Sequence, residues 1–256
     1  REPCRALLLG AGAAAVVPLV TPRVRRAPQP AVAGGRTVRV MSANVYKGRA
    51  DAAAVVALVR LHRPDILALQ EQNPRFLREL AEAGLFDLLP HRVVGDGGRL
   101  ADGAIVSRHP LRPTAPELPS EYVAAIVDLP GGPVPFLCAH PLPPSSPRYE
   151  GPWIRSLAQL PAPEGWIAGG LVAGDFNATL DHPQFRSVLR GGWRDAGSEL
   201  GGGLRPTWRG RAILRLTLDH VLAPPGAAIL DYRVDAVAGS DHRAITATVE
   251  LPPAEA

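Results

Sequence analysis

Short apolar runs separated by glycine and proline recur along most of the chain, and this pattern constrains the fold more than any other feature. Four stretches instead have the spacing of helices, at 52–62, 74–83, 153–160 and 182–190. Because helices and strands mix without strict alternation, the pattern indicates an α+β sandwich of two or four layers rather than a doubly wound sheet. The predicted strands are Thr37–Ala43, Asp65–Leu69, Phe86–Pro90, Gly103–Ser107, Tyr122–Leu129, Val134–His140, Gly170–Gly174, Thr217–Ala223, Ala228–Val237 and Ala244–Leu251.

The net charge of +4 is concentrated in the first 36 residues. This arm holds six arginines and one glutamate, whereas the rest of the chain holds 22 basic and 23 acidic residues. Non-specific binding to nucleic acid depends on clustered lysine and arginine. The near-neutral body therefore shows no general preference for nucleic acid, although its composition is compatible with one local basic patch.

An apolar run of 15 residues, Ala6–Val20, lies between arginines near the N-terminus. It is shorter than the roughly 20 residues that cross a membrane, and its length matches the apolar region of a signal peptide. A Pro/Ala/Gly linker, Ala27–Gly35, follows. We therefore predict that residues 1–36 target or anchor the protein to a membrane, which favours a location at the cell membrane or outside the cell. A disordered, arginine-rich tail is the alternative.

Two cysteines exclude a disulfide framework and a structural zinc site made from cysteine alone. Cys138 lies in an apolar run and is predicted to be a buried free thiol. A bridge to Cys4 is not expected, because Cys4 lies in the compositionally distinct N-terminal arm.

Polar side chains that bind metal or phosphate stand at the ends of several predicted strands. Separately, each has an ordinary explanation, such as a turn at Asn44 or a side chain-to-backbone turn at Asp175. Asp219 is harder to explain in this way, because a carboxylate within an apolar run needs a partner. Strands that end at one edge bring such residues together. The residues are Asn44, Glu71, His140, Asp175, Asn177, Asp219, His220, Asp241 and His242.

Taken in order, these motifs resemble the endonuclease/exonuclease/phosphatase superfamily, which includes deoxyribonuclease I, apurinic endonucleases, neutral sphingomyelinases and inositol polyphosphate 5-phosphatases. The resemblance implies a four-layer αββα sandwich over residues 37–256, with a catalytic site at one end of two sheets. It also implies Mg²⁺- or Mn²⁺-dependent hydrolysis of a phosphate ester. The motifs are Ser42-Ala43-Asn44, Leu69-Gln70-Glu71, Gly103–Arg108, Ala139-His140, Gly174-Asp175-Phe176-Asn177, Leu218-Asp219-His220-Val221 and Ser240-Asp241-His242.

The resemblance assigns three residues to the metal. Glu71 would be the principal ligand and Asn44 would assist it, while Asp241 would bind a second metal or support the first. Hard oxygen ligands of this kind suit Mg²⁺, which keeps several waters and contacts the substrate phosphate.

The resemblance assigns five further residues to the reaction. His242 would be the general base for the attacking water, and Asp219 would orient and stabilise its imidazole. Asp175 and Asn177 would position the nucleophile and bind the phosphoryl oxygens. His140 matches an extra histidine of the deoxyribonuclease and sphingomyelinase branches, which contacts the phosphate; the sequence does not identify its carboxylate partner.

The sequence constrains the substrate less than it constrains the reaction. Tyr46 stands where abasic-site endonucleases have an acidic residue, and His140 stands where they have a tyrosine, so repair of abasic sites is not expected. Nucleic acid and a phospholipid headgroup both remain candidate substrates, with membrane association through residues 1–36, and a monomer is expected. The alternatives are a catalytically inactive binding module on the same fold, and a structural envelope protein in which the polar strand ends coincide by chance.

Overall fold

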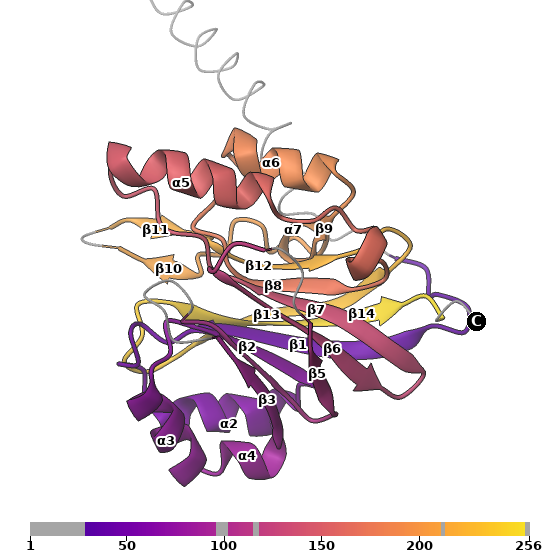
Figure 1. Cartoon of the computed structure of the whole chain (residues 1–256), viewed down its shortest axis with the longest axis horizontal. Coiled ribbons are helices and arrows are strands. Elements are labelled where there is room, and N and C mark those ends of the chain that lie inside the picture. The colour runs from indigo at the N-terminus through magenta and orange to yellow at the C-terminus, as the bar shows by residue number, and fades with distance from the viewer. Residues whose placement is uncertain (1–28, 96–101, 115–117, 211–212, 254–256) are drawn as a thin grey trace, which may run out of the picture.

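A computed structural model describes residues 29–95, 102–114, 118–210 and 213–253 of the chain. Two six-stranded sheets pack face to face, and helices cover the outer face of each (Figure 1). The α+β fold and the four-layer αββα sandwich predicted from the sequence are therefore confirmed. Cys4 and the apolar run Ala6–Val20 lie outside the described residues.

The first sheet contains β1 (Arg36–Asn44), β2 (Ile66–Gln70), β3 (His91–Val94), β4 (Ala104–Ser107), β13 (Ala228–Ala236) and β14 (Arg243–Leu251). Their order is β13-β14-β1-β2-β4-β3, so the first strand of the chain lies beside the last. β1 pairs antiparallel with β14 and parallel with β2. The parallel register places Asn44 opposite Gln70, so both strands end at the same edge of the sheet.

The second sheet contains β5 (Leu111–Pro113), β6 (Tyr122–Leu129), β7 (Gly132–Ala139), β8 (Leu171–Asp175), β9 (Arg194–Asp195) and β12 (Asp219–Ala223). Their order is β5-β6-β7-β8-β12-β9. β7 and β8 are parallel, and Asp219 of the antiparallel β12 lies directly opposite Asp175. A separate two-stranded ribbon, β10 (Trp208–Arg209) and β11 (Arg215–Leu216), precedes β12.

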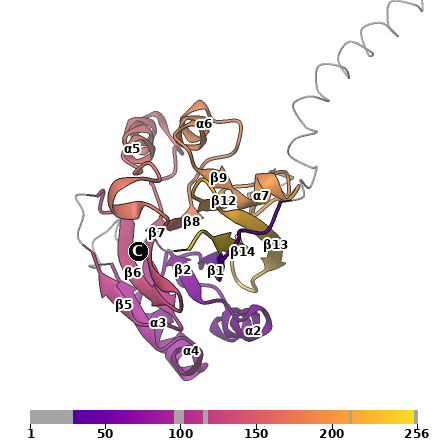
Figure 2. The same ribbon diagram turned by 90° about the vertical axis from the view of Figure 1, so that its right-hand side faces the viewer.

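The helices form the two outer layers (Figure 2). α2 (Ala52–His62), α3 (Pro74–Glu82) and α4 (Leu85–Leu88) cover the first sheet, whereas α5 (Pro147–Ala158) and α6 (Pro183–Arg190) cover the second. α2 has the predicted bounds, because Asp51 caps it by accepting a hydrogen bond from the Ala53 N–H (2.9 Å) and Arg63 ends it in a left-handed conformation. The remaining short helices are η1 (Gly165–Ile167) and α7 (Ala196–Glu199).

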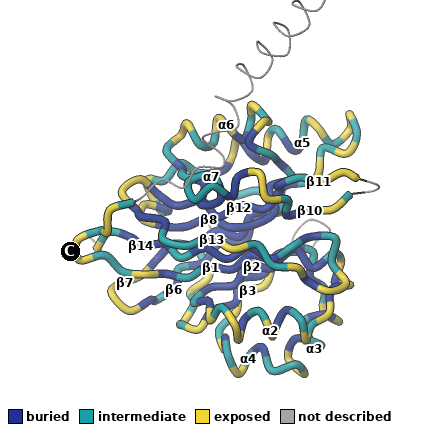
Figure 3. The backbone as a smooth tube through the Cα atoms, turned by 180° about the vertical axis from the view of Figure 1, so that it is seen from behind, coloured by how far each residue is buried: buried dark blue, intermediate teal, exposed yellow. Residues whose placement is uncertain are grey.

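Apolar side chains fill the spaces between all four layers. Val40 and Phe136 pack between the sheets, Leu80 packs under the helices of the first sheet, and Trp153 packs under those of the second. Figure 3 shows the buried backbone concentrated in the strands. Cys138 is a buried free thiol in the central layer, as predicted.

Two predicted elements differ from the structure. The run at 86–90, predicted as a strand, instead includes most of α4, and the strand β3 starts only at His91. Leu85 and Leu89 are both buried, and this spacing of four residues fits one helical turn better than a strand. The helix predicted from Trp153 starts earlier, at Pro147, because proline is tolerated in the first turn.

The end of the predicted linker lies against the folded body. The Gln29 side chain accepts a hydrogen bond from the Ile229 N–H (2.6 Å), and the Val32 N–H donates to Glu250 (2.6 Å). Within the described part of the chain, no helix has the length and apolarity needed to cross a bilayer.

Candidate active site

Asn44 connects the ends of the two sheets. Its side-chain amide donates to Glu71 Oε1 and to Asp175 Oδ2, both at 3.0 Å. Asn44 ends β1 and Glu71 directly follows β2 of the first sheet, whereas Asp175 ends β8 of the second, so one fully buried amide joins three of the predicted site residues. Its remaining oxygen accepts the Tyr46 N–H at 2.9 Å, which fixes the orientation of the amide.

Glu71 directly follows β2 and has a left-handed backbone, with φ of 56°. A non-glycine residue in this conformation costs on the order of 1 kcal/mol, and such strain is concentrated at functional sites. Its Oε2 atom is buried and accepts no hydrogen bond from the described residues. Because a buried carboxylate oxygen needs a donor or a cation, Glu71 has a ligand atom available for a metal.

His242 and Asp219 form the predicted base–orienter pair. His242 Nδ1 donates to Asp219 Oδ2 at 2.9 Å, and His242 Nε2 lies 3.5 Å from Asp175 Oδ2. Burial alone would lower the pKa of His242, but the charges of Asp219 and Asp175 and the bond to Asp219 raise it to about 10. In the metal-free protein the imidazole is therefore held protonated between two carboxylates.

Thr207 positions this pair, although the sequence analysis did not select it. Its buried hydroxyl oxygen accepts the Leu218 N–H (2.9 Å) and the Asp219 N–H (3.0 Å) at the start of β12. Its carbonyl accepts the Arg243 N–H (2.7 Å), next to His242. Thr207 thus links β12, which begins with Asp219, to β14, which begins directly after His242.

Asp175 and Asn177 lie at the end of β8, as predicted. Asp175 Oδ1 accepts the Asn177 N–H at 2.8 Å, and the Asn177 amide donates to the Pro141 carbonyl at 3.0 Å. Gly174 permits this arrangement, because a Cβ there would lie only 1.9 Å from the Ala139 carbonyl oxygen. Burial raises the pKa of Asp175, although His242 opposes the rise.

His140 has a carboxylate partner that the sequence did not reveal. Its Nδ1 donates to Asp102 Oδ1 at 2.8 Å, while its Nε2 lies 3.9 Å from both Glu71 Oε1 and Asp175 Oδ2. Burial lowers its pKa, but the bond and charge of Asp102, together with the charges of Asp175 and Glu71, outweigh this effect and raise the pKa to about 9. Asp102 precedes a glycine and a predicted strand, a pattern typical of an ordinary turn, so the sequence carried no signal for this role.

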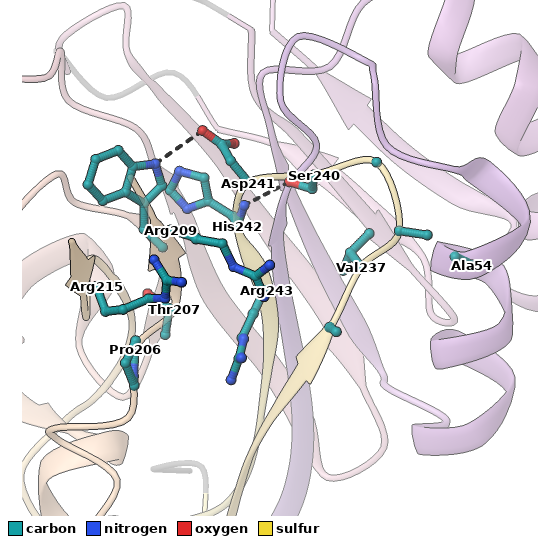
Figure 4. Close-up of a pocket in the computed structure, with 14 residues that line it drawn as sticks. Ala54, Pro206, Thr207, Arg209, Arg215, Val237, Ser240, Asp241, His242 and Arg243 are labelled. Carbon is teal, nitrogen blue, oxygen red and sulfur yellow. Dashed lines mark hydrogen bonds between the residues drawn. The ribbon is translucent and has the colours of Figure 1, made fainter. Parts of the chain in front are cut away.

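Asp241 is placed differently from the other predicted metal residues. Its Oδ2 accepts a hydrogen bond from Trp208 Nε1 at 3.1 Å, and its Oδ1 is buried without a partner among the described residues. No hydrogen bond or ion pair in the described part of the chain joins it to Glu71 or Asn44. It therefore lies beside His242, at the rim of a neighbouring pocket (Figure 4).

Three residues satisfy a simple geometric condition for a metal centre. Single ligand atoms of Asp175, Asp219 and His242 all lie within 4.8 Å of one another. His242 is one of these residues, and the other two are the carboxylates on either side of its ring. A cation bound at this point would therefore occupy the atoms that the base needs. The orphaned Glu71 oxygen offers a separate location for the metal.

His220 belongs to the core and not to the site. Its Nδ1 bonds to Asp195 (3.0 Å) and its Nε2 to the Ala178 carbonyl (2.9 Å), and the side chain is buried against Phe185. Both ring nitrogens are satisfied, so the ring fastens β12 to β9 and has no nitrogen left for a ligand.

Comparison with known proteins identifies the family. The sequence model of the endonuclease/exonuclease/phosphatase family matches residues 41–242. The chain belongs to this family. That match includes all the predicted site residues, from Asn44 to His242. No match is found among curated proteins.

Solved structures share the fold of this family member at low sequence identity. TDP2 from D. rerio, complexed with a single-strand DNA product, is 18% identical with a TM-score of 0.65, covering 83% of this chain and 98% of its own. Sphingomyelinase C from Streptomyces griseocarneus is 16% identical with a TM-score of 0.58, covering 83% and 99%. A Staphylococcus aureus beta toxin variant with bound magnesium ions is 13% identical with a TM-score of 0.57, covering 83% and 99%.

Proposed function

We propose that this protein is a divalent-metal-dependent phosphoesterase that hydrolyses phosphodiester or phosphomonoester bonds with a water activated by His242. The observation that carries this proposal is the orientation of the imidazole. Asp219 holds Nδ1, so Nε2 faces Asp175 and, through it, the Asn44–Glu71 pair. A base is thereby fixed beside an acidic cluster at the junction of the two sheets.

The donor set beside Asn44 fits a hard divalent cation such as Mg²⁺ or Mn²⁺. Glu71 has one buried oxygen without a hydrogen-bond donor among the described residues, and carboxylate and amide oxygens are suitable ligands. Glu71 would hold the first ion with the help of Asn44, and Asp241, with its own orphaned oxygen, would hold a second ion or support the first. A cation bound there would supply positive charge that lowers the pKa of His242 and stabilises the phosphoryl oxygens.

The protein's own groups account for the proton transfers. His242 Nε2, once neutral, accepts a proton from the attacking water while the water oxygen bonds to phosphorus. The ester oxygen leaves with the electron pair of its bond to phosphorus. Asp219 stabilises the imidazolium that forms, because their hydrogen bond strengthens with charge. Asp102 holds His140 so that its Nε2 lies near Asp175. There the imidazole donates a hydrogen bond to a phosphoryl or leaving-group oxygen.

The substrate class rests on chemistry common to two groups of relatives. One solved neighbour holds a DNA product and another is a sphingomyelinase, so nucleic acid and a phospholipid headgroup are both candidates for this chain. We further propose that the protein acts as a monomer at the cell membrane or outside the cell, with residues 1–36 providing the membrane association. The support for this setting is the apolar, arginine-flanked arm in the sequence.

The test is hydrolysis of plasmid DNA, sphingomyelin vesicles and bis-p-nitrophenyl phosphate, with Mg²⁺ or Mn²⁺ and with EDTA. We expect EDTA to abolish turnover and His242→Gln to reduce it at least about 100-fold, as expected for loss of a general base. The matched control is His109→Gln, because His109 pairs with Asp65 away from the site residues. Turnover that persists in EDTA would contradict the metal mechanism, and turnover that is indifferent to His242→Gln would contradict the role of His242 as the base. No turnover of any of the three substrates would favour an inactive binding module.

A further inference from the structure

A pocket beside the proposed base is lined by three arginines. It has a volume of about 490 Å³ and lies between the β10–β11 ribbon and the loop that joins β13 to β14. Arg209 comes from β10, Arg215 from β11 and Arg243 from the first position of β14. Figure 4 shows the three side chains gathered at one side of this pocket, next to His242.

The ribbon brings two of these charges together at a cost. Arg209 and Arg215 are direct cross-strand partners in β10–β11. Like charges directly opposite each other on an antiparallel pair are destabilising. Backbone hydrogen bonds, among them Arg209 N–H to the Asp241 carbonyl (2.9 Å), hold the ribbon in place despite this repulsion. An anion held near both guanidinium groups would weaken this repulsion.

The protein supplies little negative charge to compensate. Asp241 is the only acid among the described residues that line the pocket, and its Oδ2 is already used by Trp208 Nε1. Within the described ranges, no residue accepts a hydrogen bond or forms an ion pair with the guanidinium of Arg209 or Arg243. The side chains that line the pocket thus include three arginines and one acid, in a body whose overall charge is near zero.

The arginines are also fixed relative to the proposed base. Arg243 directly follows His242 in the chain, and the Arg209 N–H donates to the Asp241 carbonyl at 2.9 Å. Trp208 forms an isolated β-bridge with His242. The pocket thus adjoins the position where the scissile phosphate would lie, yet its lining residues do not include Glu71, Asn44 or His140.

We propose that Arg209, Arg215 and Arg243 form a subsite for a second phosphate of the substrate, and that the substrate is a nucleic-acid strand. This inference rests on the proposed phosphoesterase function. Guanidinium groups bind phosphate oxygens with good geometry, and a strand presents a further phosphodiester on each side of the scissile one. A choline phospholipid presents one phosphate followed by a cation, which three arginines would repel.

The decisive experiment varies only the charge of the second phosphate. The substrates are a trinucleoside diphosphate and its two isomers in which one linkage is a neutral methylphosphonate. We expect the full-length protein to cleave the doubly charged substrate with at least a tenfold higher kcat/KM than one of the isomers. The triple variant Arg209→Gln, Arg215→Gln, Arg243→Gln should remove this preference. Arg186→Gln, at an exposed position on α6, is the matched control and should retain it.

Binding tests the subsite independently of turnover. Fluorescence anisotropy with a labelled oligonucleotide gives the slope of log K against log salt, which changes by about 0.7 for each phosphate contact on a single strand. We expect the triple variant to lose at least one contact by this measure, and Arg186→Gln to lose none. Equal slopes would overturn the subsite even if no substrate is hydrolysed.

Three other results separate this inference from the proposed function. Hydrolysis of bis-p-nitrophenyl phosphate with equal cleavage of the doubly charged trinucleotide and both singly charged isomers would overturn the subsite and leave the phosphoesterase activity standing. Turnover of sphingomyelin vesicles in preference to every oligonucleotide would overturn the assignment of substrate class. A salt slope that falls in the triple variant, together with no turnover of any ester, would support the anion site and reject the enzymatic function.

Discussion

Asp219 and His242 stand at the ends of strands from different sheets, yet their side chains share a hydrogen bond of 2.9 Å. Asp219 is the first residue of β12 in the second sheet, and His242 directly precedes β14 in the first. The bond therefore spans the junction between the two central layers, close to the point where Asn44 joins them through Asp175. The reactivity of the proposed base thus depends on how the two sheets are packed against each other.

Replacing the orienting carboxylate should impair the base without removing it. In Asp219→Asn the side chain keeps its shape but loses the charge that raises the pKa of His242. We expect kcat on bis-p-nitrophenyl phosphate to fall by a factor of about 100 or more, since a base in the wrong tautomer loses most of its effect. NMR titration should show a lower pKa for His242 than in the unmodified protein. An unchanged imidazole titration would contradict the assigned pairing.

The metal-free protein should lose stability in alkaline solution. The folded pKa values of His140 and His242 are raised to about 9 and about 10, whereas an unfolded histidine titrates near pH 6.5. The folded state therefore retains protons that the unfolded state releases. The associated stability is complete below about pH 6.5 and is lost as the pH rises through 9 and 10.

The measurement is Tm in EDTA from pH 6 to pH 10.5. A falling Tm is expected for the unmodified protein, and the fall should be smaller in His140→Gln, which removes one of the two groups. His109→Gln serves as the matched control, because it lies outside the site and should reproduce the unmodified profile. A Tm that stays level or rises over this interval would refute the protonated state of the two imidazoles.

Thr207 offers a test of positioning that is separate from charge. Thr207→Val removes a hydroxyl that accepts two buried N–H groups, from Leu218 and Asp219. Each buried donor left without an acceptor costs about 1–3 kcal/mol, so Tm should fall. We also expect kcat to fall more than KM rises, because Asp219 loses its register with His242. Thr207→Ser keeps the hydroxyl and should restore both values; failure of the serine variant to do so would show that the methyl group matters instead.

Much of this site could be predicted from the sequence because its signals are local. Asn44 and Asp175 end buried apolar strands and Glu71 directly follows one, and strand ends at one edge converge whatever the conformation of the loops. The layered fold followed from the same strands and from helices with clear periodicity. Asp219 stood out because a carboxylate inside an apolar run needs a partner, and the structure provides His242.

The parts that could not be predicted depend on contacts between distant segments. Asp102 and Thr207 lie in loops and act through single hydrogen bonds to other elements, so no periodic pattern marks them. The ribbon β10–β11 pairs only two residues on each strand, too few to give an alternating signal. The arginine pocket could not be predicted for a related reason. Its three arginines lie far apart in the sequence, between 209 and 243, and only the ribbon and the β13–β14 loop bring them together.

Glu71 provides a direct test of metal binding that needs no substrate. Its buried Oε2 has no hydrogen-bond donor among the described residues, so Mg²⁺ should bind the folded state and raise Tm with the logarithm of its concentration above Kd. Glu71→Gln removes the negative charge and should abolish this rise, while Glu79→Gln, at an exposed helix position paired with Arg75, should preserve it. Calorimetric titration with Mg²⁺ should give the same ranking. If Glu71→Gln kept the full Mg²⁺-dependent rise in Tm, the ion would have to bind elsewhere, and the cluster of Asp175, Asp219 and His242 would become the leading metal site.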